Sequence, residues 1–140
     1  MKRDSTAFGA VRPAYDKADC SVRALAVATG CTYQQASAIY SAAGRMLKKG
    51  TNVETSVRVH EQWLKMRRIT DYDGWMLAAF IAANPKGRFV LHKRGHAFSV
   101  IDGVLHDWED TTKPRTEIRR VWEVTEETLA RIEKAAKVFE

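Results

Sequence analysis

Residues 88–108 carry the clearest structural signal of this chain. They read Arg88-Phe89-Val90-Leu91-His92-Lys93-Arg94-Gly95-His96-Ala97-Phe98-Ser99-Val100-Ile101-Asp102-Gly103-Val104-Leu105-His106-Asp107-Trp108. Apolar and β-branched residues predict three strands, at 88–92, 96–101 and 104–108. Lys93-Arg94-Gly95 predicts a tight turn between the first two, and Asp102-Gly103 predicts a two-residue hairpin loop that favours positive φ. An antiparallel meander therefore forms the second half of the chain.

The segment before this meander has helical patterning. Residues 1–18 are predicted to be irregular, because Gly9, Pro13 and mixed charges break any period. Helices are then expected from about residue 20 to 29, 33 to 43, 52 to 66 and 74 to 83. Their predicted N-caps are Asp19, Thr32, Thr51 and Asp73, with capping boxes at Thr32–Gln35 and Thr51–Glu54. Gly30, Gly44 and Asn84-Pro85 are expected to end the helices at 29, 43 and 83.

A fourth strand and a last helix are predicted after the meander. Residues 111–116 form a polar loop, residues 117–124 alternate as a strand does, and Thr125 caps an amphipathic helix that contains Leu129 and Ile132. Helices followed by a strand meander indicate the α+β class, with the helices packed on one face of an antiparallel sheet. We expect residues 1–140 to form a single domain.

Composition narrows the class of protein. The chain has 140 residues, of which 45% are hydrophobic and 29% charged, and this suits one domain with a real core. It has no apolar run long enough to span a bilayer, so we expect a cytoplasmic protein that does not enter a membrane. The two cysteines, Cys20 and Cys31, favour neither a disulfide scaffold nor a zinc motif.

The chain is basic, with 23 Lys and Arg against 17 Asp and Glu. This excess suits nucleic acid or an acidic protein as a partner. Because the basic residues are scattered and no nucleic-acid motif accompanies them, a solvated basic surface is the favoured interpretation.

Cys20 is the candidate nucleophile. At the first turn of its helix the positive end of the macrodipole favours the thiolate. The free backbone N–H groups of Cys20 and Ser21 are placed to stabilise an oxyanion. The alternative is a small buried apolar residue, which is the usual role of a lone cysteine.

The register of the predicted hairpin indicates which residues could be partners of Cys20. If Asp102-Gly103 is the loop, Ile101 pairs with Val104, and His96 and Asp107 become diagonal neighbours on one sheet face, roughly 7–8 Å apart. Asp107 then accepts a hydrogen bond from the imidazole and fixes its tautomer, so that the other nitrogen faces the thiol. Glu109, directly opposite His96, competes for this role.

Other residues near the predicted site have supporting or rival roles. Trp108 is placed to shield the His–Asp pair from water. A metal site of His92, His96 and His106 is disfavoured, because a turn separates the first two and His106 faces away.

Three motifs resemble the papain-like cysteine peptidases, most of all small proteins of this kind in phages and bacteria. The motifs are Asp19-Cys20-Ser21-Val22-Arg23-Ala24, Gly95-His96-Ala97-Phe98-Ser99-Val100 and Asp102-Gly103-Val104-Leu105-His106-Asp107-Trp108. The bacteriocin-leader-processing peptidases are similar at the Asp-Cys opening. The resemblance implies a papain-like fold with Cys20 as nucleophile, His96 as base and acid, and Asp107 as orienting group.

The resemblance also draws attention to residues just before the cysteine. Where the superfamily usually has a Gln, this chain has Ala14-Tyr15-Asp16, and a carboxylate cannot donate a hydrogen bond unless it is protonated. Asp16 and Asp19 are therefore expected only to support the site. Oxyanion stabilisation is expected to rest on backbone N–H groups.

Together these observations predict a cysteine-dependent hydrolase without a cofactor. It would act on an amide, isopeptide or thioester bond of a protein or peptide, in the host cytoplasm if a phage encodes it. The same triad serves acyl transfer, deamidation and transglutamination. The alternative is an inactive scaffold of this fold that binds a host protein or nucleic acid through its basic surface.

Overall fold

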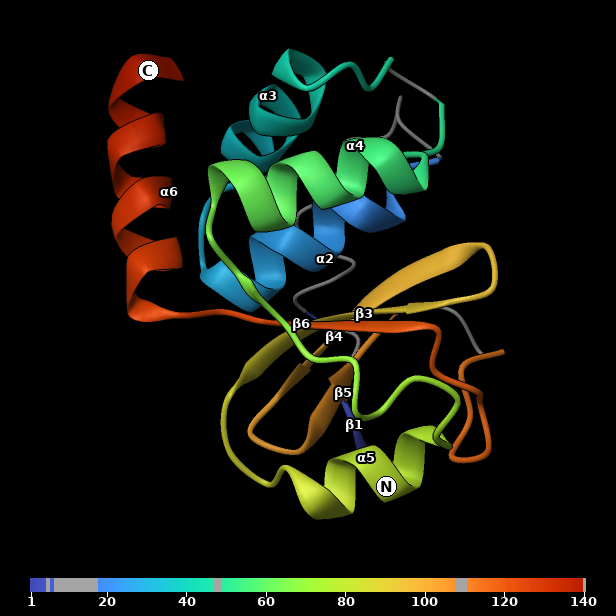
Figure 1. Ribbon diagram of the computed structural model, residues 1–140. Helices are drawn as coiled ribbons and strands as arrows, with labels where there is room; N and C mark the ends of the chain where they lie inside the picture. The colour runs from blue at the N-terminus through green and yellow to red at the C-terminus, as the bar shows by residue number, and fades with distance from the viewer. Residues whose placement is uncertain (5, 7–17, 47–48, 108–110, 140) are drawn as a thin grey trace.

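Helices and strands follow one another in a mixed order in the computed structural model, which describes residues 1–4, 6, 18–46, 49–107 and 111–139 (Figure 1). The helices are α2 (Cys20–Thr29), α3 (Tyr33–Ala42), α4 (Val53–Val57), the π-helical segment η1 (Arg58–Trp63), α5 (Leu77–Ala83) and α6 (Glu126–Phe139). The strands are β1 (Lys2–Arg3), β2 (Arg67–Arg68), β3 (Arg88–Lys93), β4 (His96–Ile101), β5 (Val104–His106) and β6 (Arg120–Glu123). The α+β class is thus confirmed. Within the described ranges, no helix has the length and apolar character needed to cross a membrane.

The strands form one sheet in the order β1-β5-β4-β3-β6-β2. The predicted hairpin register is confirmed, because Ile101 pairs with Val104 around a loop in which Asp102 has φ 47° and Gly103 has φ 78°. Lys93 pairs with His96, so the first turn has Arg94 and Gly95 as its two loop residues. The sequence placed the starts of these strands correctly because the turn residues and the β-branched runs act locally. Two ends differ, since β3 extends to Lys93 and β5 already ends at His106.

The sheet is mixed, and the prediction of a purely antiparallel sheet is wrong at one edge. β1 pairs in parallel with β5, with Lys2 opposite Val104. Residues 1–18 are therefore not wholly irregular. β2 was also not predicted, and the strand predicted at 117–124 is shorter, at Arg120–Glu123. Strands of only two basic residues have no apolar alternation, so only pairing with a distant strand creates them.

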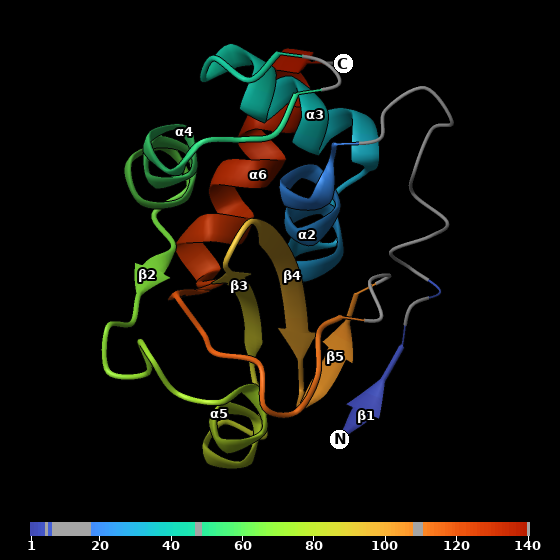
Figure 2. The ribbon, with the colours of Figure 1, turned by 90° about the vertical axis from the view of Figure 1, so that its right-hand side faces the viewer.

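Helices cover both faces of the sheet, which corrects the prediction that they pack on one face. α2 lies on β4 and β3, where Ser99 Oγ donates to the Ala24 carbonyl at 2.8 Å. α5 lies against the other face, and its Phe80 ring meets the Phe89 ring of β3 with centroids 5.1 Å apart (Figures 1 and 2). Consecutive apolar residues in β3 require cover on both faces, which is the physical reason for this arrangement.

Several helix starts differ from their predicted N-caps. The capping box of Thr32 and Gln35 is confirmed at α3. Asp19 precedes α2 but makes no side-chain cap bond, α4 is capped by Asn52 in place of Thr51, and α5 starts after Met76 instead of Asp73. Asp73 instead forms an ion pair with Arg68, at 2.7 Å. Each displaced cap follows from a competing tertiary or neighbouring contact that the local pattern does not contain.

The predicted third helix is shorter and partly π-helical. It ends at Trp63, whose side chain is 37% exposed, although Leu64 and Met66 beyond it are buried.

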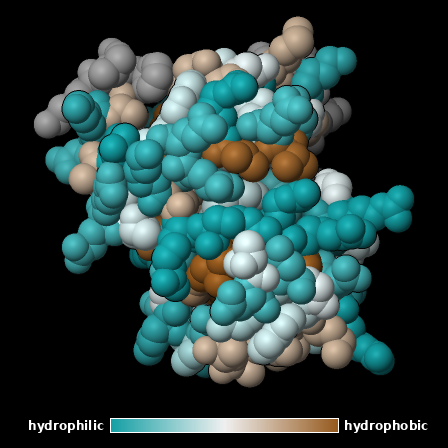
Figure 3. Space-filling view, in the orientation of Figure 1, coloured by the Kyte–Doolittle hydropathy of each residue, from teal (hydrophilic) through white to brown (hydrophobic). Residues whose placement is uncertain are grey.

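The face of the molecule seen in Figure 3 is mainly hydrophilic, with hydrophobic side chains in small separate areas. This face therefore shows the pattern of an ordinary solvated surface.

Candidate active site

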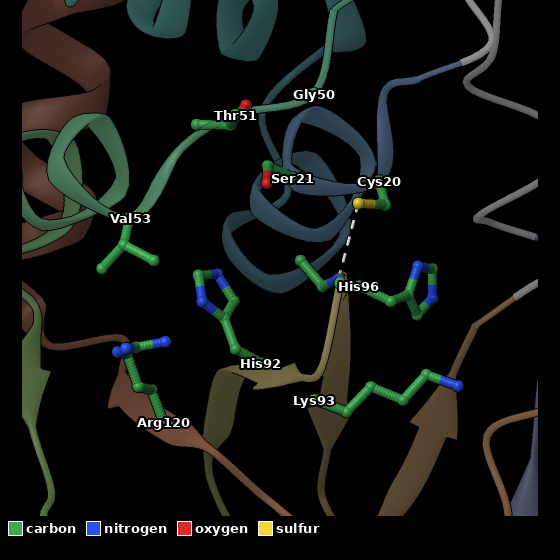
Figure 4. Close-up of a pocket in the computed structure, with 11 residues that line it drawn as sticks. Cys20, Ser21, Gly50, Thr51, Val53, His92, Lys93, His96 and Arg120 are labelled. Atoms are coloured by element: carbon green, nitrogen blue, oxygen red, sulfur yellow. Dashed lines mark hydrogen bonds between the residues drawn. The ribbon is translucent and has the colours of Figure 1, made fainter.

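Cys20 is the first residue of α2, at the point where that helix meets the start of β4. Its Sγ accepts a hydrogen bond from the backbone N–H of Ala97, with a nitrogen-to-sulfur distance of 3.4 Å (Figure 4). An N–H that points at a sulfur stabilises its negative form more than its neutral form. The thiol therefore has a fixed donor that comes from a residue 77 positions away.

His96 and Asp107 form a buried hydrogen-bonded pair. His96 Nε2 lies 2.8 Å from Asp107 Oδ1, and the two residues are 8% and 0% exposed. Thr112 donates its hydroxyl to the other oxygen, Asp107 Oδ2, at 2.6 Å. Both carboxylate oxygens are thus engaged, so Asp107 is held as an acceptor for the imidazole N–H.

His96 lines the same pocket as Cys20, and the thiol and the imidazole shift each other's pKa. Burial lowers the pKa of His96, but its hydrogen bonds to Asp107 and Cys20 and their negative charges outweigh burial and raise it to about 9. Burial likewise raises the pKa of Cys20, yet His96, the Ala97 amide and the Ser21 hydroxyl together bring it below its usual 9.0. Both shifts favour a thiolate beside an imidazolium.

The second cysteine has a different environment. Cys31 is also a free thiol, but burial raises its pKa above 9.0 and the hydrogen bond to Thr29 does not offset this. The two cysteines therefore differ in the direction of their pKa shifts.

The structure describes some of the predicted supporting residues. Ser21 is buried and lines the same pocket as Cys20. The Asp19 carboxylate pairs with Arg23 at 3.1 Å and accepts a hydrogen bond from the Tyr33 hydroxyl at 3.0 Å. These contacts fix the start of α2, and with it the backbone of Cys20. Trp108, Glu109 and Asp16 lie outside the described residues.

A pocket of about 160 Å³ opens beside the thiol. Its walls come from the start of α2, from Gly50, Thr51 and Val53 before and in α4, and from His92 and Arg120 on the sheet (Figure 4). Pockets for whole small molecules are larger, roughly 300–1,000 Å³. The volume suits one side chain of a longer substrate.

The other histidines lie apart from the triad. His106 pairs with Ser99, on the sheet face that α2 covers, whereas Asp107 follows on the opposite face. His92 is a pocket residue in contact with the rings of His60 and Trp122. In the ranges that the structure describes, no three residues among His, Cys, Asp and Glu are grouped to hold a metal.

Sequence reasoning missed three features of the site. The Ala97 amide and Thr112 become partners of the triad only when β4, α2 and the loop after β5 come together. Arg120 meets His92 because these residues are opposite each other in the β3–β6 pairing. No local motif contains any of these contacts, although the alternation in residues 117–124 did place Arg120 and Trp122 on one face.

Comparisons with known proteins add no relative to this picture. No protein-family model, no curated protein and no solved structure matches the chain. The geometry of the described residues is therefore the ground on which a function is proposed.

Proposed function

We propose that this chain is a cysteine-dependent hydrolase with a papain-like arrangement of Cys20, His96 and Asp107. One observation carries the proposal: His96, which is hydrogen-bonded to the buried Asp107 carboxylate, lines the same pocket as the Cys20 thiol, and the amide of the next residue, Ala97, donates to that sulfur. A nucleophile next to a base that a third group orients is the constellation of covalent acyl-transfer catalysis.

In the proposed reaction, the Cys20 thiolate attacks an amide, isopeptide or thioester carbonyl and forms a carbon–sulfur bond. The carbonyl π electrons move to the oxygen, and the backbone N–H groups of Cys20 and Ser21, in the first turn of α2, would stabilise that oxyanion. As the oxyanion collapses, the bond to the leaving group breaks and the His96 imidazolium protonates that group.

Water then completes the cycle. Neutral His96 takes a proton from water as it attacks the thioester carbonyl of the acyl-enzyme, and the Cys20 thiolate leaves with the bonding electrons. The acid product departs and the thiolate–imidazolium pair is restored. Asp107, fixed by Thr112, keeps the imidazole in one orientation through both steps. The reaction needs no cofactor.

Alkylation by iodoacetamide tests this proposal without knowledge of the substrate. At pH 7 we expect Cys20 to react at least about tenfold faster than Cys31, because only the thiolate is the nucleophile. His96→Gln should remove most of this difference. Mass spectrometry of the two cysteine peptides over time gives both rates in one sample, so Cys31 serves as the internal control.

Equal and slow alkylation of both cysteines in the folded wild-type protein would refute the hydrolase proposal. Circular dichroism of each variant shows whether a lost rate reflects lost chemistry or lost folding. A positive result leads to screening of acyl thioesters and peptide amides, with Cys20→Ser as the inactive control.

A further inference from the structure

A positively charged wall faces the thiol across the pocket. His92 of β3 and Arg120 of β6 are opposite each other in the sheet, and both line the pocket that contains Cys20. Figure 4 shows the Arg120 side chain and the His92 ring side by side, on the sheet side of the pocket and below Val53 and Thr51. Two adjacent strands thus present a guanidinium and an imidazole at one place.

Arg120 has no partner in the described part of the chain. Its side chain is half-buried, yet no ion pair or hydrogen bond joins it to any residue that the structure describes. Among the described residues, the pocket lining also contains Lys93 but no Asp or Glu. A half-buried cation without a counter-ion is unfavourable, and an anionic ligand would relieve this cost.

His92 supplies an independent observation. The residue is 9% exposed, and its Nε2 atom is buried with no hydrogen-bond partner in the ranges that the structure describes. Burial, followed by the charges of Arg120 and Arg68, lowers the pKa of His92 to about 3, so the ring is neutral near pH 7. An unpaired buried N–H or lone pair costs about 1–3 kcal/mol, and buried polar atoms are normally satisfied.

We propose that Arg120 and His92 form a subsite for a carboxylate of the substrate, next to the bond that Cys20 attacks. This inference rests on the proposed hydrolase function and specifies its substrate class: an acidic side chain or a free chain terminus. The planar guanidinium can donate two parallel hydrogen bonds to a carboxylate. Because His92 is neutral near pH 7, the wall of Arg120 and His92 carries one positive charge, which matches the single negative charge of a carboxylate.

Four iodoacetyl probes test the subsite at the thiol itself. Iodoacetyl-glutamate α-amide carries a side-chain carboxylate, and iodoacetyl-glycine carries a terminal one. The matched neutral probes are iodoacetyl-glutamine α-amide and iodoacetyl-glycinamide. Each alkylates the cysteine sulfur and releases iodide, and the quantity measured is the acidic-to-neutral rate ratio within each pair, at Cys20 and at Cys31.

In wild-type protein at low salt, the ratio should be about tenfold higher at Cys20 than at Cys31, for the pair whose carboxylate reaches Arg120. Arg120→Gln should lower the Cys20 ratio about tenfold. Arg119→Gln is the matched control, because it removes the same charge from a neighbouring side chain that is 53% exposed. The glutamate and glycine pairs distinguish a side-chain from a terminal carboxylate.

The outcomes separate the two proposals. If Cys20 outpaces Cys31 with the neutral probes but shows no acidic preference, or keeps its preference in Arg120→Gln, the subsite is refuted and the hydrolase stands. If Cys20 reacts no faster than Cys31 with any probe, the hydrolase proposal and the subsite proposal are both refuted. Should Arg120→Gln not fold, sodium chloride gives the answer in wild-type protein, because a preference that depends on charge must shrink as salt rises.

Discussion

His96 and Asp107 meet diagonally across the β4–β5 hairpin, with His96 Nε2 2.8 Å from Asp107 Oδ1. The last pair of that ladder away from the turn is Ser99 with His106, so both residues lie just beyond the paired part of the hairpin. At this point β4 also meets the start of α2, where the Ala97 amide contacts Cys20 Sγ. Three separate segments therefore converge within one hydrogen-bonded group.

The pH dependence of Cys20 alkylation should show the influence of His96. Because the pKa of Cys20 lies below 9.0, its rate with iodoacetamide should reach half of its maximum below pH 9. In His96→Gln the hydrogen bond and positive charge of the imidazolium are lost while burial remains, so the midpoint should move above pH 9. Rates of Cys20 peptide alkylation from pH 5 to 10 measure both midpoints. A midpoint that does not move would show that His96 has no electrostatic influence on the thiol.

Asp107 and Thr112 should have graded effects on the same reaction. Asp107→Asn removes the negative charge that raises the pKa of His96, so the pKa of Cys20 should rise and its alkylation at pH 7 should slow by about tenfold or more. Thr112→Val removes only the donor to Asp107 Oδ2 and should slow the reaction less. Thr116→Val is the matched control, because the Thr116 hydroxyl accepts from the Lys113 N–H in the same loop. An equal effect of both threonine changes would contradict a specific role for Thr112.

The buried pair of Asp19 and Arg23 should contribute strongly to stability. Their side chains are 0% and 2% exposed, and Asp19 also accepts from the Tyr33 hydroxyl. Asp19→Asn leaves the Arg23 cation buried without its carboxylate and should lower the free energy of unfolding by about 3–5 kcal/mol in urea denaturation. Glu127→Gln breaks an exposed pair of the same spacing, with Arg131, and should cost less than about 0.5 kcal/mol. Similar losses in the two variants would contradict this account.

Stability should fall in acid partly because of His92. Its pKa is about 3 in the folded chain and near 6.5 when unfolded, so between these values the unfolded chain binds more protons there. The contribution is complete above pH 6.5 and is lost as pH falls, by roughly 3 kcal/mol between pH 7 and 4. Burial also lowers the pKa of His60 well below 6.5, so His60 acts in the same direction.

His92→Gln removes this titration, so its urea stability should fall less steeply between pH 7 and 4 than that of wild-type protein. The comparison uses the slope against pH, since the substitution also changes stability at pH 7. Parallel slopes would exclude His92 as a source of acid sensitivity.

Local sequence signals determined much of the fold. The Asp102-Gly103 turn set the register of β4 and β5, and the box of Thr32 and Gln35 set the start of α3, because each signal acts between residues close in the chain. That register makes His96 and Asp107 diagonal neighbours on one face of the sheet. Cys20 at a helix start was predicted for the same local reason.

These local signals did not predict the contacts between distant segments. The position of α5 on the second face, the pairing of β1 and β2 at the edges, and the replacement of Thr51 by Asn52 as a cap depend on packing partners far along the chain or on competing local bonds. The sequence by itself thus determined which residues are candidates for the proposed chemistry, since residue type and turn geometry are local. Only the tertiary structure decided that Ala97, Thr112 and the Arg120–His92 wall surround them, because burial and charge at a site arise from segments that meet after folding.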